Sequence, residues 1–351
     1  MNAAPVPATH REVHLAARPE GPLTTDHFRL VEAPVPVAGP RRILVRNRLM
    51  GVTAVMRTLM AGSGELPMPG YAPGAVLSGP AVGEVISAPE GSLKRGDLVE
   101  HNAGWREYAA LGEDEAQRLD LEALPDPVAH LSQGFVAWLA VVRGAEIRTG
   151  DTVLVTGAAG GVGTMAGQFA RLHGAARVIG STSSRQKADR LTDRLGYDAA
   201  VIRSAGPIDD QLRALAPDGL DAVIDLVGGD QLRAALAQAR QGARIALVGS
   251  LASQTAGSAM APVVIDTAHV LNRGITLRGI AGHAHPDALG QWTEEFGRGL
   301  RAGTLTVPHT LVQGIDRAPQ ALCDLLAGRH IGAVLIELGG RPHGGGKTGC
   351  A

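Results

Sequence analysis

The sequence is poor in aromatic residues, in cysteine and in net charge. Trp, Tyr and Phe together make up 3% of its 351 residues, so the core must be built mainly from Ala, Val, Leu and Ile. The two cysteines, Cys323 and Cys350, cannot form a disulfide framework, which fits a reducing compartment and predicts a cytoplasmic location. A formal net charge of −1 provides no basic field to collect phosphate backbones, so nucleic acid is not expected as a partner.

Long apolar segments are also missing. Residues 1–11 contain Pro and Ala but lack the apolar core of a signal peptide. The uncharged stretch 245–265 is interrupted by residues such as Gly249, Gln254 and Pro262, which make it too polar to span lipid. No membrane partner is therefore expected. By contrast, 47 Gly and 21 Pro predict many tight turns and short elements.

The pattern of the sequence changes near residue 125. Before this point, short β segments such as 28–31, 43–45 and 82–86 are separated by Pro and Gly, which predicts a small barrel or sandwich. After it, apolar strands such as 152–156 and 222–226 alternate with amphipathic helices, which predicts a parallel sheet covered on both faces. The Gly-rich segment 339–351 is expected to be a flexible tail.

The most informative segment is TVLVTGAAGGVG at 152–163. An apolar strand runs into a turn of small residues, and an amphipathic helix follows at once. In a Rossmann fold such a turn lets a dinucleotide pyrophosphate approach the backbone and the helix N-terminus, where N–H groups favour anions. Cofactor contacts are therefore expected from five residues, with a plain tight turn as the alternative. These residues are Ala159, Gly160, Gly161, Val162 and Gly163.

The end of the next strand indicates which dinucleotide is bound. A site that prefers NAD usually has an acidic residue there, about 20 residues after the turn. The segment GSTSSRQK at 180–187 has none, and instead offers Ser183, Ser184, Arg185 and Lys187. Hydroxyls and cations suit a 2′-phosphate through charge-assisted hydrogen bonds, so the sequence predicts NADP. The alternative is a solvated helix start with exposed cations.

With these motifs the chain resembles the zinc-independent leukotriene/prostaglandin reductase and alkenal double-bond reductase branch of the medium-chain dehydrogenase/reductase superfamily. The resemblance covers residues 18–338 and rests on AAGGVG at 158–163, LGYD at 195–198, DAVIDLVGG at 221–229 and GARIALVG at 242–249. It implies an α/β fold in which a Rossmann doubly wound parallel sheet is inserted into a GroES-like β-barrel substrate domain. The implied boundaries are 1–124 and 309–338 for the substrate domain and 125–308 for the NADP-binding domain. A homodimer joined through the cofactor sheets is implied as well.

The resemblance also implies roles for individual residues. Lys187 matches the family lysine that binds the 2′-phosphate, and Arg203 stands where the family has a tyrosine that shares this duty. Gly282 matches the stretch that passes the nicotinamide carboxamide. The strand-end residues expected to line the nicotinamide end are Val227, Gly249, Ser250 and Leu251.

A metal is not expected in this chain. Zinc-dependent relatives carry an early Cys in the barrel and a Gly-His-Glu segment, but residues 74–76 read GAV and the cysteines lie near the C-terminus. His283 and His285 would share one face of an extended segment, yet no third ligand is apparent.

The substrate side departs from the family pattern. The tyrosine of an Asp-Pro-Tyr-Met-Arg segment is replaced by Val55, a second tyrosine falls near His283 and His285, and a third survives as Tyr71. Tyr71, His283 and His285 are therefore the candidate catalytic donors, with packing or ligand positioning as the alternative for each. Ser132, Gln133, Phe135 and Trp138 form either a pocket wall or a buried domain junction.

The expected reaction is NADPH-dependent reduction of a C=C bond conjugated to a carbonyl, including an enoyl reduction in a biosynthetic pathway. Hydride reaches the β-carbon, and a hydrogen-bond donor stabilises the enolate that forms. Quinone reduction with NADPH is the rival function, since it uses the same cofactor geometry and needs little acid catalysis. A nucleotide-binding relative without catalysis is a further alternative, because the fold alone would permit it.

Overall fold

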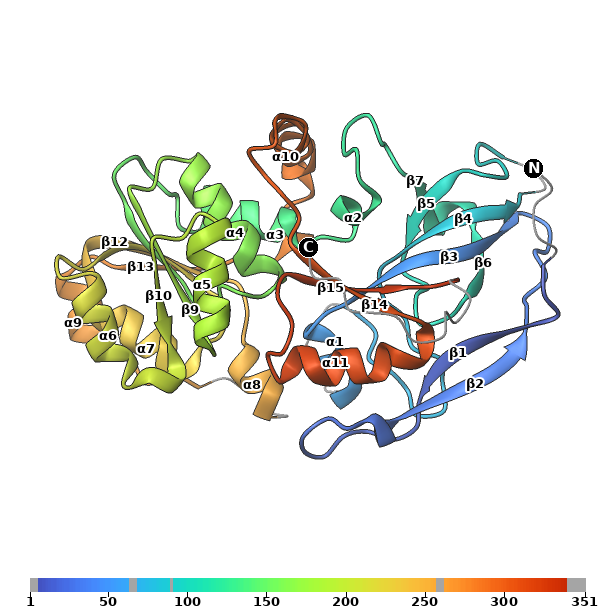
Figure 1. Cartoon of the computed structure of the whole chain (residues 1–351), viewed down its shortest axis with the longest axis horizontal. Coiled ribbons are helices and arrows are strands. Elements are labelled where there is room, and N and C mark those ends of the chain that lie inside the picture. The colour runs from blue at the N-terminus through green and yellow to red at the C-terminus, as the bar shows by residue number, and fades with distance from the viewer. Residues whose placement is uncertain (1–5, 63–67, 89–90, 257–261, 340–351) are drawn as a thin grey trace.

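The computed structural model describes residues 6–62, 68–88, 91–256 and 262–339 (Figure 1). Figure 1 shows two halves: a parallel sheet flanked by helices, and a second group of strands that contains both the first and the last strands of the chain. Of the tail expected at 339–351, only Gly339 is described, and the rest lies outside the described residues.

The helix-flanked half is built on a six-stranded sheet in which all neighbouring strands are parallel. The order β10-β9-β8-β11-β12-β13 is the 3-2-1-4-5-6 order of a doubly wound Rossmann fold. The strands are β8 (Thr152–Val155), β9 (Arg177–Thr182), β10 (Ala199–Ile202), β11 (Leu220–Asp225), β12 (Ala239–Leu247) and β13 (Thr276–Gly279). The strand order reverses between β8 and β11, where ligands bind in folds of this kind.

Helices cover both faces of this sheet because its central strands are apolar at consecutive positions. Within β8, Val153 and Val155 join one core cluster with Phe169, whereas Leu154 joins a second cluster with Leu212. This two-sided burial is the one expected for parallel strands. The helices are α3 (Gly134–Leu139), α4 (Gly161–Leu172), α5 (Arg185–Arg194), α6 (Ile208–Leu215), α7 (Gly229–Ala237), α8 (Leu251–Ala256), α9 (Thr267–Asn272) and α10 (Leu289–Ala302).

The second sheet joins the two ends of the described chain. Its order is β14-β15-β3-β4-β5-β7, and β6 also pairs with β3. Because β15 pairs antiparallel with β3, the Rossmann half is an insertion into this half, and the predicted fold class is confirmed. The elements are β3 (Arg42–Val52), α1 (Val55–Ala61), β4 (Ala81–Ser87), β5 (Leu98–His101), β6 (Tyr108–Gly112), β7 (Ala116–Arg118), α2 (Pro127–His130), β14 (His309–Gln313), α11 (Ala318–Leu326) and β15 (Ala333–Glu337).

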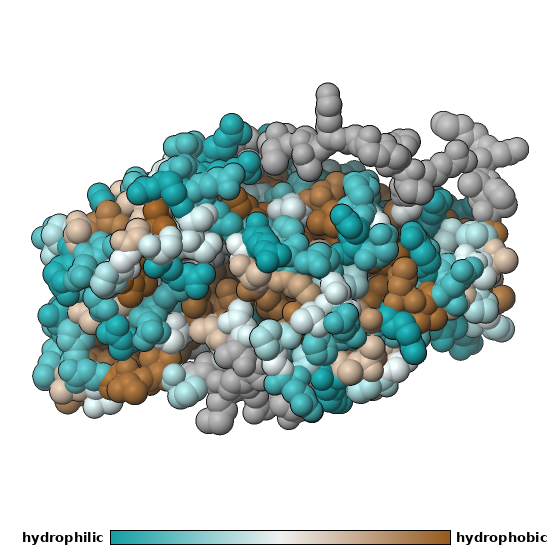
Figure 2. All heavy atoms as spheres, turned by 60° about the horizontal axis from the view of Figure 1, so that its bottom comes forward, coloured by the Kyte–Doolittle hydropathy of each residue, from teal (hydrophilic) through white to brown (hydrophobic). Residues whose placement is uncertain are grey.

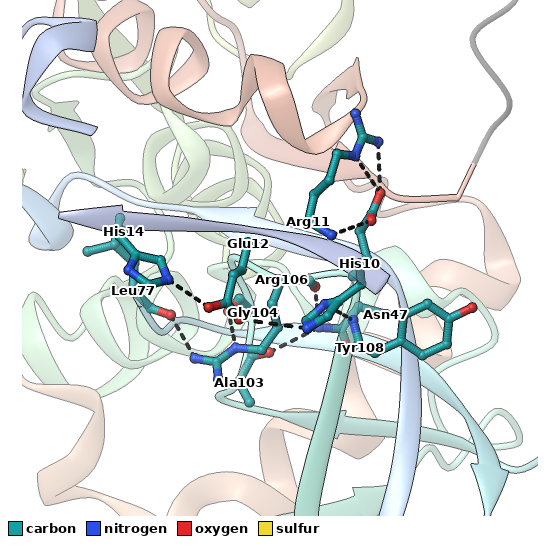
Figure 3. A network of polar contacts seen from close by, with 11 residues as sticks. His10, Arg11, Glu12, His14, Asn47, Leu77, Ala103, Gly104, Arg106 and Tyr108 are labelled. Carbon is teal, nitrogen blue, oxygen red and sulfur yellow. Dashed lines mark hydrogen bonds and ion pairs between the residues drawn. The ribbon is translucent and has the colours of Figure 1, made fainter. Parts of the chain in front are cut away.

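The first hairpin, formed by β1 (Thr9–Leu15) and β2 (Phe28–Pro34), is tied to this sheet by the polar contacts drawn in Figure 3. Nδ1 of His10 accepts a hydrogen bond from the Tyr108 N–H at 3.2 Å. Arg11 donates from Nη2 to Glu107 at 2.7 Å, and Arg106 forms an isolated β-bridge with Glu12. Burial lowers the pKa of His10, so an uncharged ring fits its position as an acceptor.

The surface offers no extended apolar region on the face drawn in Figure 2, where apolar patches lie between polar side chains. Single exposed apolar residues are ordinary on folded proteins. Among the helices within the described ranges, none combines the length and the apolar character needed to cross a membrane.

Candidate active site

The turn between β8 and α4 has the backbone geometry that a dinucleotide site requires. Gly157 adopts a left-handed φ of 61°, and Gly160 is extended at the N-cap of α4 and exposed. A Cβ on Gly163 would lie 2.6 Å from Cα of Ala158, so only glycine lets α4 pack this closely on the turn. The first turn of a helix leaves N–H groups without intrahelical partners, and here they lie beside the exposed backbone of Gly160.

The residues expected at a 2′-phosphate gather at the carboxyl ends of the adjacent strands β9 and β10. Ser184 caps α5 and accepts a hydrogen bond from the Lys187 N–H at 3.4 Å. The Ser204 hydroxyl donates to the carbonyl of Ser183, which places the segment after β10 against the segment after β9. Arg203 is exposed at this edge. Burial lowers the pKa of Lys187, and the positive charge of Arg203 lowers it further.

Lys187 has partners that the sequence does not suggest. Its Nζ atom donates to the carbonyl oxygens of Gly328, at 2.5 Å, and His330, at 2.6 Å. Both carbonyls belong to the loop 327–332 between α11 and β15. The same loop reaches the phosphate turn, where the Gly332 N–H donates to the Ala159 carbonyl at 2.9 Å. A loop of the C-terminal segment therefore borders the edge of the sheet where the cofactor residues lie. In the sequence its only sign is the pair Gly328 and Gly332, which both adopt left-handed φ in the structure.

The residues expected near the nicotinamide meet at the carboxyl ends of β11 and β12. The Leu251 N–H donates to the Leu226 carbonyl, and the Gly249 N–H donates to the Asp225 carbonyl. A Cβ on Gly249 would lie 2.8 Å from the Leu226 oxygen, so this approach also requires glycine. Val227, Gly249, Ser250 and Leu251 are thus brought together by neighbouring strands.

Gly282 follows β13 and packs beside α3. A Cβ there would lie 3.2 Å from Cγ2 of Val136 and 3.8 Å from a ring carbon of Phe135. Phe135 in turn packs against Trp292, with ring centroids 5.5 Å apart. Trp138 is fully buried and donates from Nε1 to Glu295 of α10 at 3.0 Å, so it packs in the core of the Rossmann half.

The three candidate catalytic side chains lie in different surroundings. Tyr71 is buried in the core of the second half, and its hydroxyl donates to the Ser78 carbonyl at 2.5 Å. Burial raises the pKa of Tyr71 above its usual range. Because a phenol has a single proton, Tyr71 could donate to a substrate only after it releases Ser78.

The two histidines lie after β13, on the Rossmann half. His283 is exposed on the short 3-10 helix η5 (Gly282–Ala284). Nδ1 of His285 lies 3.4 Å from Nη1 of Arg143. The Nη2 atom of Arg143 donates to Asp287 at 2.8 Å. His285 therefore lies beside the ion pair of Arg143 and Asp287 near the surface.

Helices from the two halves meet beside the segment that follows β12. Helix α8, which begins directly after Ser250, packs against α1, and Val55 is the first residue of α1. The side chain of Gln133 reaches the start of α4, where its Oε1 would lie 1.9 Å from a Cβ on Gly161. The sequence interpretation left Gln133 either in a pocket wall or at a buried domain junction, and it did not foresee this contact with the phosphate turn.

A Rossmann sheet with a glycine-rich turn at its switch point, inserted into a β-rich second domain, defines a two-domain dehydrogenase or reductase of the dinucleotide-binding class. Family models agree: residues 11–119 match an N-terminal domain of oxidoreductase, and residues 161–296 match a family described as zinc-binding dehydrogenase. Within the described part of the chain, no group of three or more His, Cys, Asp or Glu side chains could hold a metal ion. Independence of zinc stays a prediction for this chain.

Individual relatives are similar over nearly the whole length. The putative NADP-dependent oxidoreductase YfmJ of Bacillus subtilis is 31% identical over 340 residues, which cover 94% of this chain and 98% of the relative. The NADPH-dependent curcumin reductase of Escherichia coli is 28% identical, over 93% and 96%. The crystal structure of CurA in complex with NADPH from Vibrio vulnificus aligns with a TM-score of 0.86 at 26% identity, over 94% and 100%. The chain belongs to the medium-chain dehydrogenase/reductase superfamily, in its prostaglandin and alkenal reductase branch, as the motifs predicted.

Proposed function

We propose that this protein is an NADPH-dependent reductase of C=C bonds conjugated to a carbonyl group. The observation that carries the proposal is the spatial order of the expected cofactor residues. Along the sheet edge from β10 to β13 they follow the strands: Arg203, Ser183 to Lys187, the phosphate turn, Val227, Gly249 to Leu251, and Gly282. This row would hold a dinucleotide extended across the switch point, with its 2′-phosphate at one end and its nicotinamide toward the other.

The preference for NADP rests on charge. The end of β9 carries no acidic residue over 180–187, while Lys187 and Arg203 lie close enough for one charge to affect the pKa of the other. Two cations at one corner repel each other, and a bound phosphate relieves that repulsion. The names of the curcumin reductase and of the 2-alkenal reductase of Nicotiana tabacum, 27% identical to this chain, specify NADPH or NADP for those proteins.

The reaction needs few protein side chains. When bound, NADPH supplies the hydride for the β-carbon of the substrate. The chain orients the cofactor through the turn at 157–163 and the row of strand ends. A hydrogen-bond donor then stabilises the substrate enolate. The Tyr71 proton is engaged with the Ser78 carbonyl. The remaining candidate donors to the enolate are therefore His283 and His285, which lie near solvent at the edge of the Rossmann sheet.

Quinone reduction is the second candidate, and the environment of Tyr71 favours it. A quinone accepts hydride without a dedicated acid, so a buried, engaged phenol would be no handicap. The two functions are separated by following NADPH oxidation with a panel of enones, enals, enoyl thioesters and quinones. We expect the highest kcat/KM with an enone or enal. Turnover of quinones alone would replace the leading proposal by the second. Failure to oxidise NADPH with any acceptor, or a preference for NADH, would contradict both.

We further propose a cytoplasmic homodimer joined through the edge of the Rossmann sheet. The edge strand β13 supports this assembly, as do Val264 and Leu271 of the neighbouring segment, which are 87% and 79% exposed. The measurement is molar mass by light scattering, for the wild type and for Leu271→Glu. We expect about twice the chain mass of 36.2 kDa for the wild type, and a monomer for the variant. A monomeric wild type would contradict the proposal.

A further inference from the structure

Four buried polar side chains lie beneath the cofactor edge and bind one another in pairs. They are Thr156, Ser181, Asp225 and Gln231, with exposed fractions between 0% and 8%. Buried polar groups are costly unless they are hydrogen-bonded, and apolar residues of similar size would fill the same space at less cost. Their presence therefore calls for an explanation in terms of what they hold in place.

The first pair joins the carboxyl ends of the two strands at the switch point. Oγ1 of Thr156 donates to Oδ1 of Asp225 at 2.7 Å and accepts from the Leu226 N–H at 2.8 Å. Oδ2 of Asp225 accepts from the Gly228 N–H at 2.9 Å. Burial raises the pKa of Asp225, and these donors oppose that effect. The pair thus fixes the turn 226–228, which carries Val227, to the end of β8.

The second pair holds the phosphate turn itself. The Gly157 N–H donates to Oγ of Ser181 at 2.9 Å, and the Ala158 N–H donates to the Ser181 carbonyl at 2.9 Å. The Ser181 hydroxyl donates onward to Oε1 of Gln231. Gln231 lies on α7, the helix that follows the turn 226–228. The start of the phosphate turn is therefore connected, through Ser181 at the end of β9, to α7, the helix that follows the turn 226–228.

The two turns also touch directly. A Cβ on Gly157 would lie 3.1 Å from Cγ2 of Val227, so the side chain of Val227 rests against the phosphate turn. A displacement of either turn would therefore move the other. Because one turn is expected at the pyrophosphate and the other at the nicotinamide, their separation determines how a dinucleotide lies between them.

We propose that Thr156, Ser181, Asp225 and Gln231 are positioning residues that set the separation between the phosphate turn and the turn 226–228, and with it the placement of the nicotinamide. The inference rests on the proposed function. It predicts that a ligand spanning both turns is sensitive to these residues, whereas a ligand that ends at the phosphate turn is much less so.

The test compares the binding of NADP⁺ with that of 2′,5′-ADP by calorimetry, in Asp225→Asn and Thr156→Val. In Asp225→Asn, the amide nitrogen would face the Gly228 N–H, and two donors cannot pair. We expect NADP⁺ affinity to fall about tenfold or more while 2′,5′-ADP affinity changes less than about twofold, and kcat to fall about 10- to 100-fold. Thr156→Ser keeps both hydrogen bonds of the hydroxyl, so its two affinities and its kcat should equal those of the wild type.

Asp151→Asn is the matched control. Asp151 is a buried carboxylate just before β8, at the opposite edge of the sheet, and it binds Arg244 and the Arg148 N–H. This variant should lower Tm without changing the ratio of the two affinities. If Asp225→Asn does not fold, Ser181→Ala removes one acceptor in a milder way and is measured instead.

The possible outcomes separate the two levels of the argument. If the wild type binds neither ligand, the proposed function fails. If the wild type binds both ligands, but the variants of Thr156, Ser181 and Asp225 change both affinities equally or leave both unchanged, the positioning role fails while the function stands.

Discussion

The ammonium group of Lys187 lies 2.5 Å from the carbonyl oxygen of Gly328, although the two residues belong to different halves of the molecule. The loop that carries Gly328 also binds the phosphate turn through Gly332. The carbonyls of Gly328 and His330 engage two of the three ammonium protons, which leaves the third to donate to a 2′-phosphate. The lysine thus links recognition of the phosphate to the position of the loop 327–332.

Lys187→Ala should raise the KM for NADPH about 10- to 100-fold, because a lost charge-assisted contact to phosphate costs about 1.5–3 kcal/mol. The KM for NADH should change little, since NADH lacks the 2′-phosphate. Steady-state kinetics with both cofactors checks this. The control is Arg194→Ala, which removes a charge from the exposed far end of the same helix. Equal losses with NADPH and NADH would show that Lys187 acts only as a tie between the halves.

Two glycines of the phosphate turn should respond differently to alanine. Gly163→Ala places a methyl group 2.6 Å from Cα of Ala158 and should destabilise the fold by about 1–3 kcal/mol. Gly160→Ala meets nothing closer than the Gly157 carbonyl oxygen at 3.4 Å, so Tm should be nearly unchanged. NADP⁺ affinity should still fall, because the methyl group occupies the path of the pyrophosphate. Thermal unfolding and calorimetry measure the two effects, and undiminished NADP⁺ affinity in Gly160→Ala would argue against the turn as the binding site.

Tyr71→Phe distinguishes packing from catalysis at the surviving tyrosine. The variant keeps the ring in the core but removes the hydrogen bond to Ser78. We expect a loss of about 1 kcal/mol in the free energy of unfolding, with kcat for a good enone within about twofold of the wild type. A decrease of about 10- to 1,000-fold in kcat with unchanged NADPH affinity would instead identify Tyr71 as the donor to the enolate.

His101 should make the protein sensitive to mild acid. Burial, with a contribution from Arg106, lowers the pKa of His101 from 6.5 to about 4, and its Nδ1 accepts from the Ala103 N–H. The unfolded chain binds a proton at this site as pH falls below 6.5, whereas the folded chain does so only near pH 4. Stability should therefore decline across this range, by on the order of 3 kcal/mol in total.

The measurement for His101 is denaturant unfolding between pH 4 and pH 7. His101→Asn retains an acceptor but cannot titrate, so its stability should depend less on pH. Some dependence will persist, because burial lowers the pKa of His10 as well. His309→Asn changes an exposed histidine on β14 and should leave the dependence as in the wild type. Identical pH profiles for His101→Asn and the wild type would rule out this origin of acid sensitivity.

The Rossmann half could be predicted from the sequence because its signals are local. The strand expected at 152–156 ends within a residue of β8, and that expected at 222–226 lies within two residues of β11 at each end. The strand expected at 43–45 is longer, since β3 continues to Val52 through Asn47. A polar residue tends to end an apolar run, but the amide nitrogen of Asn47 donates to the carbonyls of Ala103 and Arg106. Such pairing over long sequence separations has no local signature.

The same reason explains what the sequence missed at the site. Lys187 and Gly328 are separated by 141 positions, and nothing near either residue predicts their contact. The expected place of Tyr71 came from resemblance alone, which conveys the position of a residue along a fold but not the partner of its hydroxyl. The residues expected along the strand ends were brought together because parallel strands present their carboxyl ends at one edge.

The position of β15 between β14 and β3 has a consequence for the order in which the chain can fold during synthesis. The Rossmann half is complete once β13 and α10 have emerged from the ribosome. Strand β3 pairs early with β4 and β6, but its end at 49–52 must wait for about 280 further residues before β15 (Ala333–Glu337) is made. Until then, this end of β3 and the apolar residues that α11 covers stay exposed, and an unpaired strand edge of this kind favours association between chains. During synthesis the Rossmann half can thus fold before the second sheet is complete.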